Sequence, residues 1–365
     1  MESQYTDRLN NFRREMIARG GSAFLVSNPV NVSWLSGFAG DSSWLLVTAE
    51  EQTFLTDSRY TEQAKEECPD WQIVENNTGL IPALKEYLEH TALKGLAVDR
   101  AYMTVETFER LSLAAGAKVL LVNEKDPCYE LRQIKDRWEI LQMERAASIA
   151  DEALTLLRPA IKPGISERDL ALELYNHMSR MGSDGAAFDT IIAAGPQGAK
   201  PHARPSDYRL RKGDLVTIDF GAVVNGYRSD MTRTFVLGQA DALQTERYNL
   251  VLAAQEKAMA GIKPGVAVRD VDSLARDLIS GAGYAENFGH GLGHSVGLEI
   301  HEDPRFSRTA ENVLLKPGMI MTVEPGVYFP GWGGIRIENS VVVTEDSMKS
   351  LSGYPKTLEE MTIIC

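Results

Sequence analysis

The stretch Gly213-Asp-Leu-Val-Thr-Ile-Asp-Phe-Gly221 decides the fold of the larger part of this chain, because a close copy follows it as Gly318-Met-Ile-Met-Thr-Val-Glu-Pro-Gly326. Each copy has a glycine at both ends, a run of residues that favour a β-strand, and an acid near its end. Asp219 in the first copy therefore corresponds to Glu324 in the second. A duplicated strand that carries an acid predicts two related halves.

The repeat extends in both directions from this stretch. Downstream, Tyr227-Arg-Ser-Asp230 corresponds to Ile335-Arg-Ile-Glu338, so each copy carries a second acid. Upstream, Ile161-Lys-Pro-Gly164 returns as Ile262-Lys-Pro-Gly265, displaced by 101 residues. Two copies are too few for a solenoid. They predict two αβ halves that pack about a pseudo-twofold axis, with one pocket between them.

A hairpin in the first half determines where its two acids lie. Asn225-Gly226 is the preferred sequence of a two-residue type I′ turn. Counting back from this turn places Asp219 opposite Thr232, and Asp230 has the same parity as Thr232. The two aspartates therefore share one face of the sheet as diagonal neighbours, with Cβ atoms about 7 Å apart or somewhat less. They could hold one or two cations.

An acid on a buried strand needs a partner, because an unpaired one costs several kcal/mol. One interpretation is an ion pair with a neighbouring cation such as Arg228 or Arg233. Four carboxylates in symmetry-related places favour the other interpretation, a metal site, to which His294 in Gly291-Leu-Gly-His294 could add an imidazole. Oxygen ligands with a single nitrogen suit Mn²⁺, Co²⁺, Fe²⁺ or Zn²⁺. Two divalent ions would balance the four negative charges.

With these motifs, the second part of the chain resembles the "pita-bread" metallopeptidases. Across nearly its whole length the chain resembles the two-domain Xaa-Pro peptidases, the prolidases and aminopeptidases P. The resemblance implies a dinuclear site with two divalent ions (Mn, Co or Zn), bridged by Asp230 and Glu338. It implies five metal ligands: Asp219, Asp230, His294, Glu324 and Glu338. Glu324 is also expected to accept a proton from the attacking water, since a carboxylate that binds metal through one oxygen can do so through the other.

The resemblance also implies residues that contact the substrate. His202, His290 and His301 match positions at which imidazoles stabilise the developing oxyanion or orient the substrate. Arg305 matches a place where some prolidases carry an arginine for the terminal carboxylate of a dipeptide. The alternative for Arg305 is an ordinary surface residue in a polar loop. Arg336, beside Glu338, is expected to support the metal ligands and not to contact substrate.

The chain before the repeat has a different pattern. Short β-rich runs at 23–26, 43–47, 53–56, 71–74, 95–98 and 118–122 alternate with helical stretches, which indicates an α/β unit. We therefore expect an α/β N-terminal domain over 1–125 and an α+β pita-bread catalytic domain, duplicated about a pseudo-twofold axis, over 126–365. The absence of proline and glycine inside 131–157 predicts one long helix at the start of the second domain.

Composition restricts the partners and the location. A formal charge of -13 in 365 residues repels phosphate backbones and anionic membrane surfaces, so nucleic acid is not expected as a partner. The three scattered cysteines exclude a disulfide framework. Neither an apolar leader segment nor a run approaching the roughly 20 apolar residues of a membrane span is present. These features predict a cytoplasmic protein, and the resemblance implies a homodimer.

The expected activity is metal-dependent hydrolysis of Xaa-Pro bonds in small peptides, with dipeptides favoured over the longer substrates of an aminopeptidase P. Two alternatives share the architecture: a non-catalytic pita-bread binding protein and a metal-free, creatinase-like hydrolase. A third arises from Gly293-His-Ser-Val-Gly297, which matches the GxSxG pattern of serine hydrolases. That motif needs a helix after the serine, whereas Leu298–His301 is predicted to be a strand. Ser295 is therefore expected to be a loop residue and not a nucleophile.

Overall fold

Two units make up the chain, Met1–Arg132 and Gln133–Cys365. The computed structural model describes residues 2–117, 119–310 and 313–364, so Lys118, at the start of one predicted strand, and Cys365 lie outside the described residues. The division falls seven residues after the boundary expected at 125. The reason is that Asp126 is buried in the first unit, where Asn31 donates a hydrogen bond of 2.9 Å to its carboxylate.

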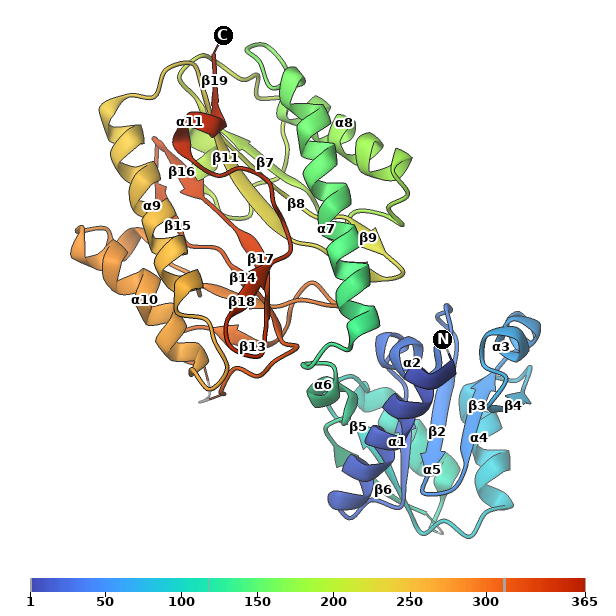
Figure 1. Cartoon of the computed structure of the whole chain (residues 1–365). Helices are drawn as coiled ribbons and strands as arrows, with labels where there is room; N and C mark the ends of the chain where they lie inside the picture. Colours follow the sequence, from blue (N-terminus) through green and yellow to red (C-terminus); the bar gives the residue numbers. More distant parts are fainter. Residues whose placement is uncertain (1, 118, 311–312, 365) are drawn as a thin grey trace. The chain divides into compact units, whose positions relative to one another are not determined.

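The first unit is a six-stranded mixed sheet with helices on both faces, drawn in blue to cyan in Figure 1. Leu25 points to the face covered by Leu84 and Leu111, and Phe24 packs edge to face against Phe12 on the other face. The α/β prediction for this unit is confirmed. Its strands, in spatial order, are β4 (Gln72–Glu75), β3 (Gln52–Thr56), β2 (Trp44–Thr48), β1 (Ala23–Val26), β5 (Gly95–Asp99) and β6 (Leu120–Glu124). Its helices are α1 (Glu2–Ala18), α2 (Pro29–Ser36), α3 (Thr61–Glu67), α4 (Leu80–Glu89), α5 (Val105–Ala115) and α6 (Cys128–Leu131).

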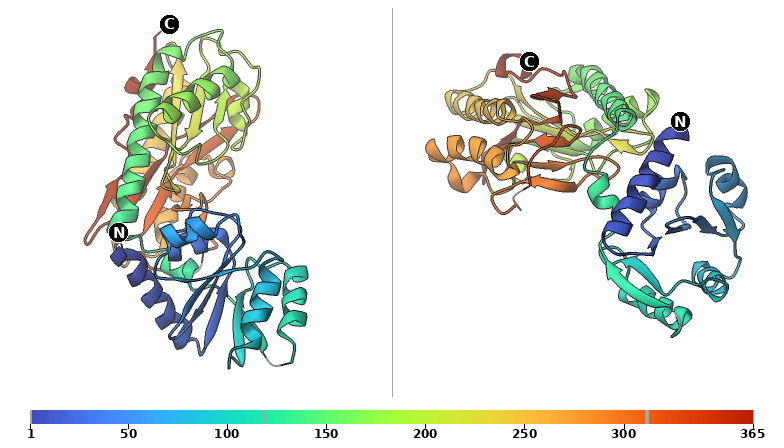
Figure 2. Two further views of the ribbon diagram at one scale, coloured as in Figure 1. Left: turned by 90° about the vertical axis from the view of Figure 1, so that its right-hand side faces the viewer. Right: turned by 60° about the horizontal axis from the view of Figure 1, so that its bottom comes forward.

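The second unit contains the repeat. Helix α8 (Glu167–Arg180) and helix α10 (Val268–Gly281) have the same length, and their bounds differ by the 101 residues of the sequence repeat. Figures 1 and 2 show α7 (Arg137–Leu157) and α8 on one side of the strands and α9 (Ala242–Ala260) and α10 on the other. Side chains of all four helices contribute to one hydrophobic core. The predicted pair of αβ halves is therefore present.

Each half of the second unit contributes one main sheet. The first is ordered β19 (Thr362–Ile363), β11 (Met231–Leu237), β8 (Leu215–Phe220) and β7 (Ile191–Ala194). The second is ordered β13 (Glu302–Phe306), β12 (Gly293–Ser295), β14 (Ile320–Val323), β17 (Asn339–Val343) and β18 (Met348–Ser350). The remaining elements are β9 (Val223–Val224) with β10 (Tyr227–Arg228), β15 (Gly326–Phe329) with β16 (Gly333–Arg336), α11 (Leu358–Met361), and the 3₁₀ turns η1 (Arg158–Ala160), η2 (Gly195–Ala199) and η3 (Ala285–Asn287).

The predicted hairpin register is confirmed. Asn225 and Gly226 have φ values of 50° and 79°, the left-handed conformation that a type I′ turn requires. On the strands that this turn connects, Thr232 lies directly opposite Asp219. The two halves then meet along β11 and the segment before β17, where the Glu338 amide donates to the Thr232 carbonyl at 3.1 Å. This contact brings the acids of the two halves together.

Two expectations about local structure are wrong. The helix predicted over 131–157 is interrupted, because the Asp136 carboxylate accepts from the Glu139 amide while the Glu139 side chain accepts from the Asp136 amide. This capping box starts a new helix, α7. Leu298–His301 is an irregular segment and not a strand. Within the described ranges, no helix combines the length and the hydrophobicity needed to cross a membrane.

Candidate metal centre

A cavity of about 500 Å³ lies in the second unit, lined by residues of both halves. Every site residue expected from the sequence lines it, although these residues are far apart in the chain. These lining residues are His202, Asp219, Asp230, His290, His294, His301, Arg305, Glu324, Arg336 and Glu338. His177 does not line this cavity and lies on α8, where its Nε2 is 3.8 Å from Glu173 Oε1.

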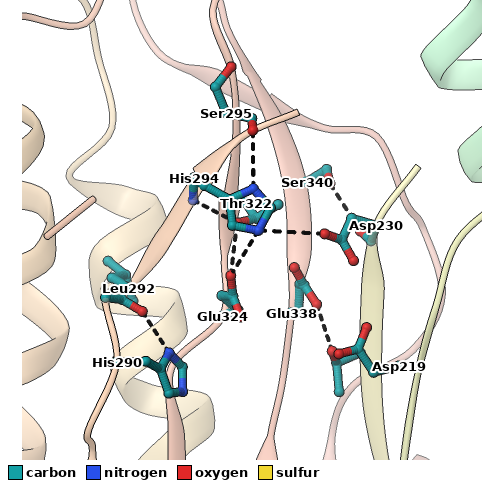
Figure 3. Close-up of polar contacts among 12 residues, drawn as sticks. Asp219, Asp230, His290, Leu292, His294, Ser295, Thr322, Glu324, Glu338 and Ser340 are labelled. Carbon is teal, nitrogen blue, oxygen red and sulfur yellow. Dashed lines mark hydrogen bonds and ion pairs between the residues drawn. The ribbon is translucent and has the colours of Figure 1, made fainter. Parts of the chain in front are cut away.

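The floor of the cavity is a cluster of carboxylates. Oxygens of Asp219, Asp230 and Glu338 lie within 4.8 Å of one another, and all three residues are buried. Asp219 is on β8 and Asp230 immediately precedes β11, whereas Glu338 precedes β17 and Glu324 follows β14. Figure 3 shows these four side chains and His294 converging on one space. The repeat therefore supplies two acids from each half to a single cluster.

His294 faces this cluster with an unprotonated nitrogen. Its Nδ1 lies 3.1 Å from the Ser295 carbonyl, which can only accept, so Nδ1 carries the hydrogen. Burial lowers the pKa of His294 to about 4, so the ring is neutral near pH 7. Its Nε2 lone pair then lies 3.4 Å from Glu324 Oε1 and 3.8 Å from Asp230 Oδ2. A lone pair that faces carboxylate oxygens needs a cation or a proton between them.

Two carboxylate oxygens of the cluster have no partner among the described residues. These are Asp219 Oδ1 and Glu338 Oε1, both buried. The second oxygens are held: Thr232 donates to Glu338 Oε2 at 2.6 Å, and Arg336 donates to Asp219 Oδ2 at 2.5 Å. The cation that pairs with these acids is therefore Arg336, and not Arg228 or Arg233. The two unpartnered oxygens fit the chemistry of a bound divalent metal ion.

Hydrogen bonds connect Arg336 to His290 through the Tyr328 hydroxyl. Arg336 Nη1 donates to the Tyr328 hydroxyl at 2.8 Å, and that hydroxyl lies 3.0 Å from His290 Nε2. His290 Nδ1 lies 2.7 Å from the Gly291 carbonyl, so Nδ1 carries the hydrogen and Tyr328 donates to Nε2. Burial lowers the pKa of His290 to about 4. Both ring nitrogens are therefore engaged within the protein.

The other three residues expected to contact substrate lie nearer solvent. His202 and His301 are exposed at the cavity wall, and the His301 ring lies 4.5 Å from the His294 ring in an edge-to-face arrangement. Arg305 lies directly opposite His294 on the paired strand. Its side chain is 57% exposed, and its Nε is 3.8 Å from Asp303. A ligand in the cavity could reach all three.

Ser295 has the environment of a structural residue. It is fully buried, its hydroxyl accepts from Lys135 Nζ at 3.1 Å, and neither residue lines the cavity. Ser295 is the last residue of strand β12 and not the loop residue expected from the sequence. The segment after it is irregular, so the helix that a nucleophile elbow requires is not formed. These observations argue against the serine-hydrolase alternative.

We predict that the metal-free protein loses stability between about pH 6.5 and pH 8. Burial raises the pKa of Glu324 to about 8 and, with the neighbouring acids, raises those of Asp230 and Glu338 well above their usual range. In this window the folded chain binds more protons than the unfolded chain, so stability falls as pH rises. The lowered pKa values of His290 and His294 have the opposite effect, but only below about pH 6.5.

The measurement is thermal unfolding with chelator and after addition of Mn²⁺. We expect the midpoint without metal to fall by about 5 °C between pH 6.5 and pH 8, and metal to raise it more at pH 8 than at pH 6.5. If Mn²⁺ does not change the thermal midpoint anywhere between pH 6.5 and pH 8, these acids do not bind the ion.

Two contributors to the centre were not identified from the sequence. Tyr328 follows the second copy of the repeat and has no motif of its own, whereas Thr232 could have been found, because the register places it beside Asp219. Both residues donate hydrogen bonds to site residues. Neither belongs to the acids and histidines that mark a metal site in a sequence.

Comparisons with known proteins agree with this architecture. Residues 141–345 match the model of metallopeptidase family M24, and residues 8–134 match the creatinase/prolidase N-terminal domain. The chain is 38% identical over 361 residues to an Xaa-Pro dipeptidase of Pyrococcus furiosus, which covers 96% of this chain and 99% of that protein.

Solved structures give the same result. The Xaa-Pro dipeptidase from Bacillus anthracis superimposes with a TM-score of 0.94 at 34% identity, covering 98% of this chain and 100% of that one. An X-Pro aminopeptidase from Thermotoga maritima gives 0.89 at 34% identity, with 97% and 99% covered. The predicted fold, an α/β N-terminal domain followed by a pita-bread catalytic domain, is confirmed. The chain belongs to metallopeptidase family M24 and carries that family's creatinase/prolidase type of N-terminal domain.

Proposed function

We propose that this protein hydrolyses Xaa-Pro peptide bonds with the help of two divalent metal ions, and that dipeptides are its preferred substrates. The observation that carries the proposal is the cluster of four carboxylates, three of them buried, around a neutral His294 in a cavity of about 500 Å³. The relatives named above as Xaa-Pro dipeptidases support the choice of bond. An Xaa-Pro bond is a tertiary amide without an N–H, so it requires a dedicated site.

The five proposed ligands are Asp219, Asp230, His294, Glu324 and Glu338, with Asp230 and Glu338 as the bridging pair. The unpartnered oxygens of Asp219 and Glu338 and the lone pair of His294 support this set. Such ions, when bound, polarise a carbonyl and make water a better nucleophile at neutral pH. Mn²⁺, Co²⁺ and Zn²⁺ all suit these ligands. We propose manganese as the first ion to test.

The surrounding residues would bind the peptide and move its protons. Glu324 lies where one of its oxygens can accept a proton from the attacking water. His202 and His301 line the cavity wall and could donate a hydrogen bond to the developing oxyanion. His290 has both nitrogens engaged, so we assign its ring a contact with the proline side chain and no proton transfer.

The preference for dipeptides rests on Arg305. A free carboxylate directly after proline exists only in a dipeptide, and a guanidinium binds it well. Arg305 lines the cavity, is 57% exposed, and lies opposite His294 across the β12–β13 pair. If Arg305 is instead a surface residue, the chain would act on longer Xaa-Pro-Yaa peptides, as an aminopeptidase P does.

Replacement of Arg305 by alanine is therefore expected to raise KM for Xaa-Pro dipeptides by about 10-fold, the lower range for loss of a hydrogen bond to a charged group. KM for Xaa-Pro-Yaa should change little. Steady-state kinetics on both substrate classes tests this, with Arg204→Ala as the matched control. Arg204 also lines the cavity and is 88% exposed. Equal effects of Arg305→Ala on both classes would argue against a carboxylate clamp.

The experiment that tests the function is a substrate panel. The purified chain, reconstituted with Mn²⁺, Co²⁺ or Zn²⁺, is assayed on Xaa-Pro dipeptides, Xaa-Pro-Yaa peptides and dipeptides without proline, before and after EDTA. Activity on Xaa-Pro that EDTA abolishes supports the proposal. Activity that survives EDTA would favour a creatinase-like hydrolase, and peptide binding without cleavage would favour a non-catalytic pita-bread protein.

We further propose that the protein is a cytoplasmic homodimer. The few, scattered cysteines support a reducing compartment. Two of them, Cys68 and Cys128, are buried as free thiols. Light scattering at several protein concentrations tests the dimer, and cell fractionation tests the location.

A further inference from the structure

We propose that Lys135 is a positioning residue of the active site, which acts on His301 through an ion pair with Glu302. The proposal rests on the proposed function in so far as it assigns His301 a role in turnover. Lys135 lies at the start of the second unit, next to the capping residue Asp136 of α7. It does not line the cavity.

The ammonium group of Lys135 is buried between two segments that carry site histidines. Its Nζ lies 3.0 Å from Glu302 Oε2 and 3.1 Å from Ser295 Oγ. The side chains of Lys135 and Glu302 are 1% and 7% exposed. Ser295 directly follows His294, and Glu302 directly follows His301. One buried cation therefore connects the neighbours of both histidines.

The Glu302 carboxylate also shapes the segment that leads to His301. Its second oxygen, Oε1, accepts from the Glu299 amide at 3.2 Å. A Cβ atom at Gly297 would lie 2.8 Å from the same oxygen, so a side chain there would displace the carboxylate from its present position. The pairing of β12 with β13 shifts register immediately after His294. Regular strand pairing therefore does not hold residues 297–301.

Side chains and a backbone hydrogen bond from the Arg228 amide to the Gly297 carbonyl, at 2.9 Å, hold this irregular segment. Besides Glu302, the Arg228 side chain donates to the Leu298 carbonyl at 3.0 Å. His301 ends the segment, with its ring 4.5 Å from that of His294 at the cavity wall. Without the Lys135 cation, the Glu302 carboxylate would be left as an unpaired buried charge, and the segment would lose one of its anchors. His301 would then move relative to the proposed metal ligands.

A Ser-Lys catalytic pair is the competing interpretation of the contact between Lys135 and Ser295. The structure argues against it, because neither residue lines the cavity and Glu302 neutralises the ammonium group. Such a pair needs an accessible serine and a neutral lysine.

The test compares Lys135→Met, Lys135→Arg and the double variant Lys135→Met/Glu302→Gln with the wild type, all loaded with Mn²⁺. Lys356→Met is the matched control, because Lys356 is also partly buried and paired with a glutamate, Glu256, but does not line the cavity. The readouts are kcat and KM on an Xaa-Pro dipeptide, thermal midpoint, metal content, and hydrogen exchange of residues 296–302.

We expect Lys135→Met to lower kcat by about 10²-fold, the cost of a displacement of about 1 Å in a catalytic site. KM and metal content should change little, and exchange should increase within 296–302. Lys135→Arg should recover part of kcat. The double variant should recover thermal stability, because no buried charge is left unpaired, but not kcat. In a His301→Ala background, Lys135→Met should cost less than about 3-fold, because two residues that act as a unit are not additive.

Two results would overturn the proposal. One is a wild-type kcat in a Lys135→Met variant that is folded, or in the double variant once its stability is restored. The other is a full loss of about 10²-fold from Lys135→Met in the His301→Ala background. If the wild type cleaves no Xaa-Pro peptide, the proposed function fails. The exchange comparison still decides whether Lys135 anchors the segment.

Discussion

Asp230→Asn is expected to lower hydrolysis by about 10³-fold or more, the order of loss when one member of a catalytic unit is removed, and to prevent full metal loading. Asp230 is one of the three buried acids whose oxygens lie within 4.8 Å of one another. As a proposed bridging ligand, it would hold both ions. An amide has a similar size but no negative charge, so the substitution removes ligation without creating a cavity.

The same substitution should have the opposite effect on the stability of the metal-free protein. Burial, followed by the charges of Glu338, Asp219 and Glu324, raises the pKa of Asp230 well above its usual range. In the absence of metal this acid is therefore destabilising near pH 8, and its replacement should raise the thermal midpoint. An ordinary structural acid would lower the midpoint on removal, so the sign of the change separates the two interpretations.

Activity, metal content and thermal midpoint with and without chelator are the measurements. Asp189→Asn is the matched control, because Asp189 lines the same cavity but its side chain is 93% exposed and lies outside the cluster. That variant should retain its metal. Two metal ions per chain in Asp230→Asn would refute the bridging assignment, and wild-type turnover would refute the site.

His301→Ala and His202→Ala are each expected to lower kcat by roughly 10²–10³-fold, the range for loss of one hydrogen-bond donor to a developing oxyanion. Both side chains line the cavity and are exposed, so few packing contacts are lost when either is truncated. The thermal midpoint should therefore remain close to that of the wild type. Steady-state kinetics and thermal unfolding on the same preparations are the measurements.

His177→Ala is the control for these two variants. His177 lies on α8 beside Glu173 and outside the cavity, so its loss should leave kcat unchanged. If kcat falls in the His202 and His301 variants only in proportion to the fall in thermal midpoint, both residues have a structural role.

The limits of reading the sequence are visible in two segments. The long helix predicted over 131–157 divides because the Asp136 and Glu139 side chains cap a new helix, a local signal that was present but outweighed by helix propensity. The strand predicted at 298–301 does not form, because the Glu302 carboxylate and Arg228 compete for its backbone groups. The start of α7 is therefore encoded by neighbouring residues, whereas the irregular segment depends on side chains from other strands.

The sequence by itself determined the duplicated architecture and the acids that face one another. Type I′ turn geometry and strand parity act between neighbours in the chain, so they place Thr232 opposite Asp219 without any tertiary contact. The same repeat predicted a second pair of acids at Glu324 and Glu338.

Only the tertiary structure decided which groups complete the site. Arg336 reaches Asp219 across 117 residues of chain, whereas the Arg228 and Arg233 side chains, the partners that the sequence suggests, donate to backbone carbonyls elsewhere. Lys135 and Glu302, 167 residues apart, likewise become partners only after both halves have folded. The physical reason is that an ion pair depends on distance and desolvation in space. Turns and strand alternation depend on the order of residues along the chain.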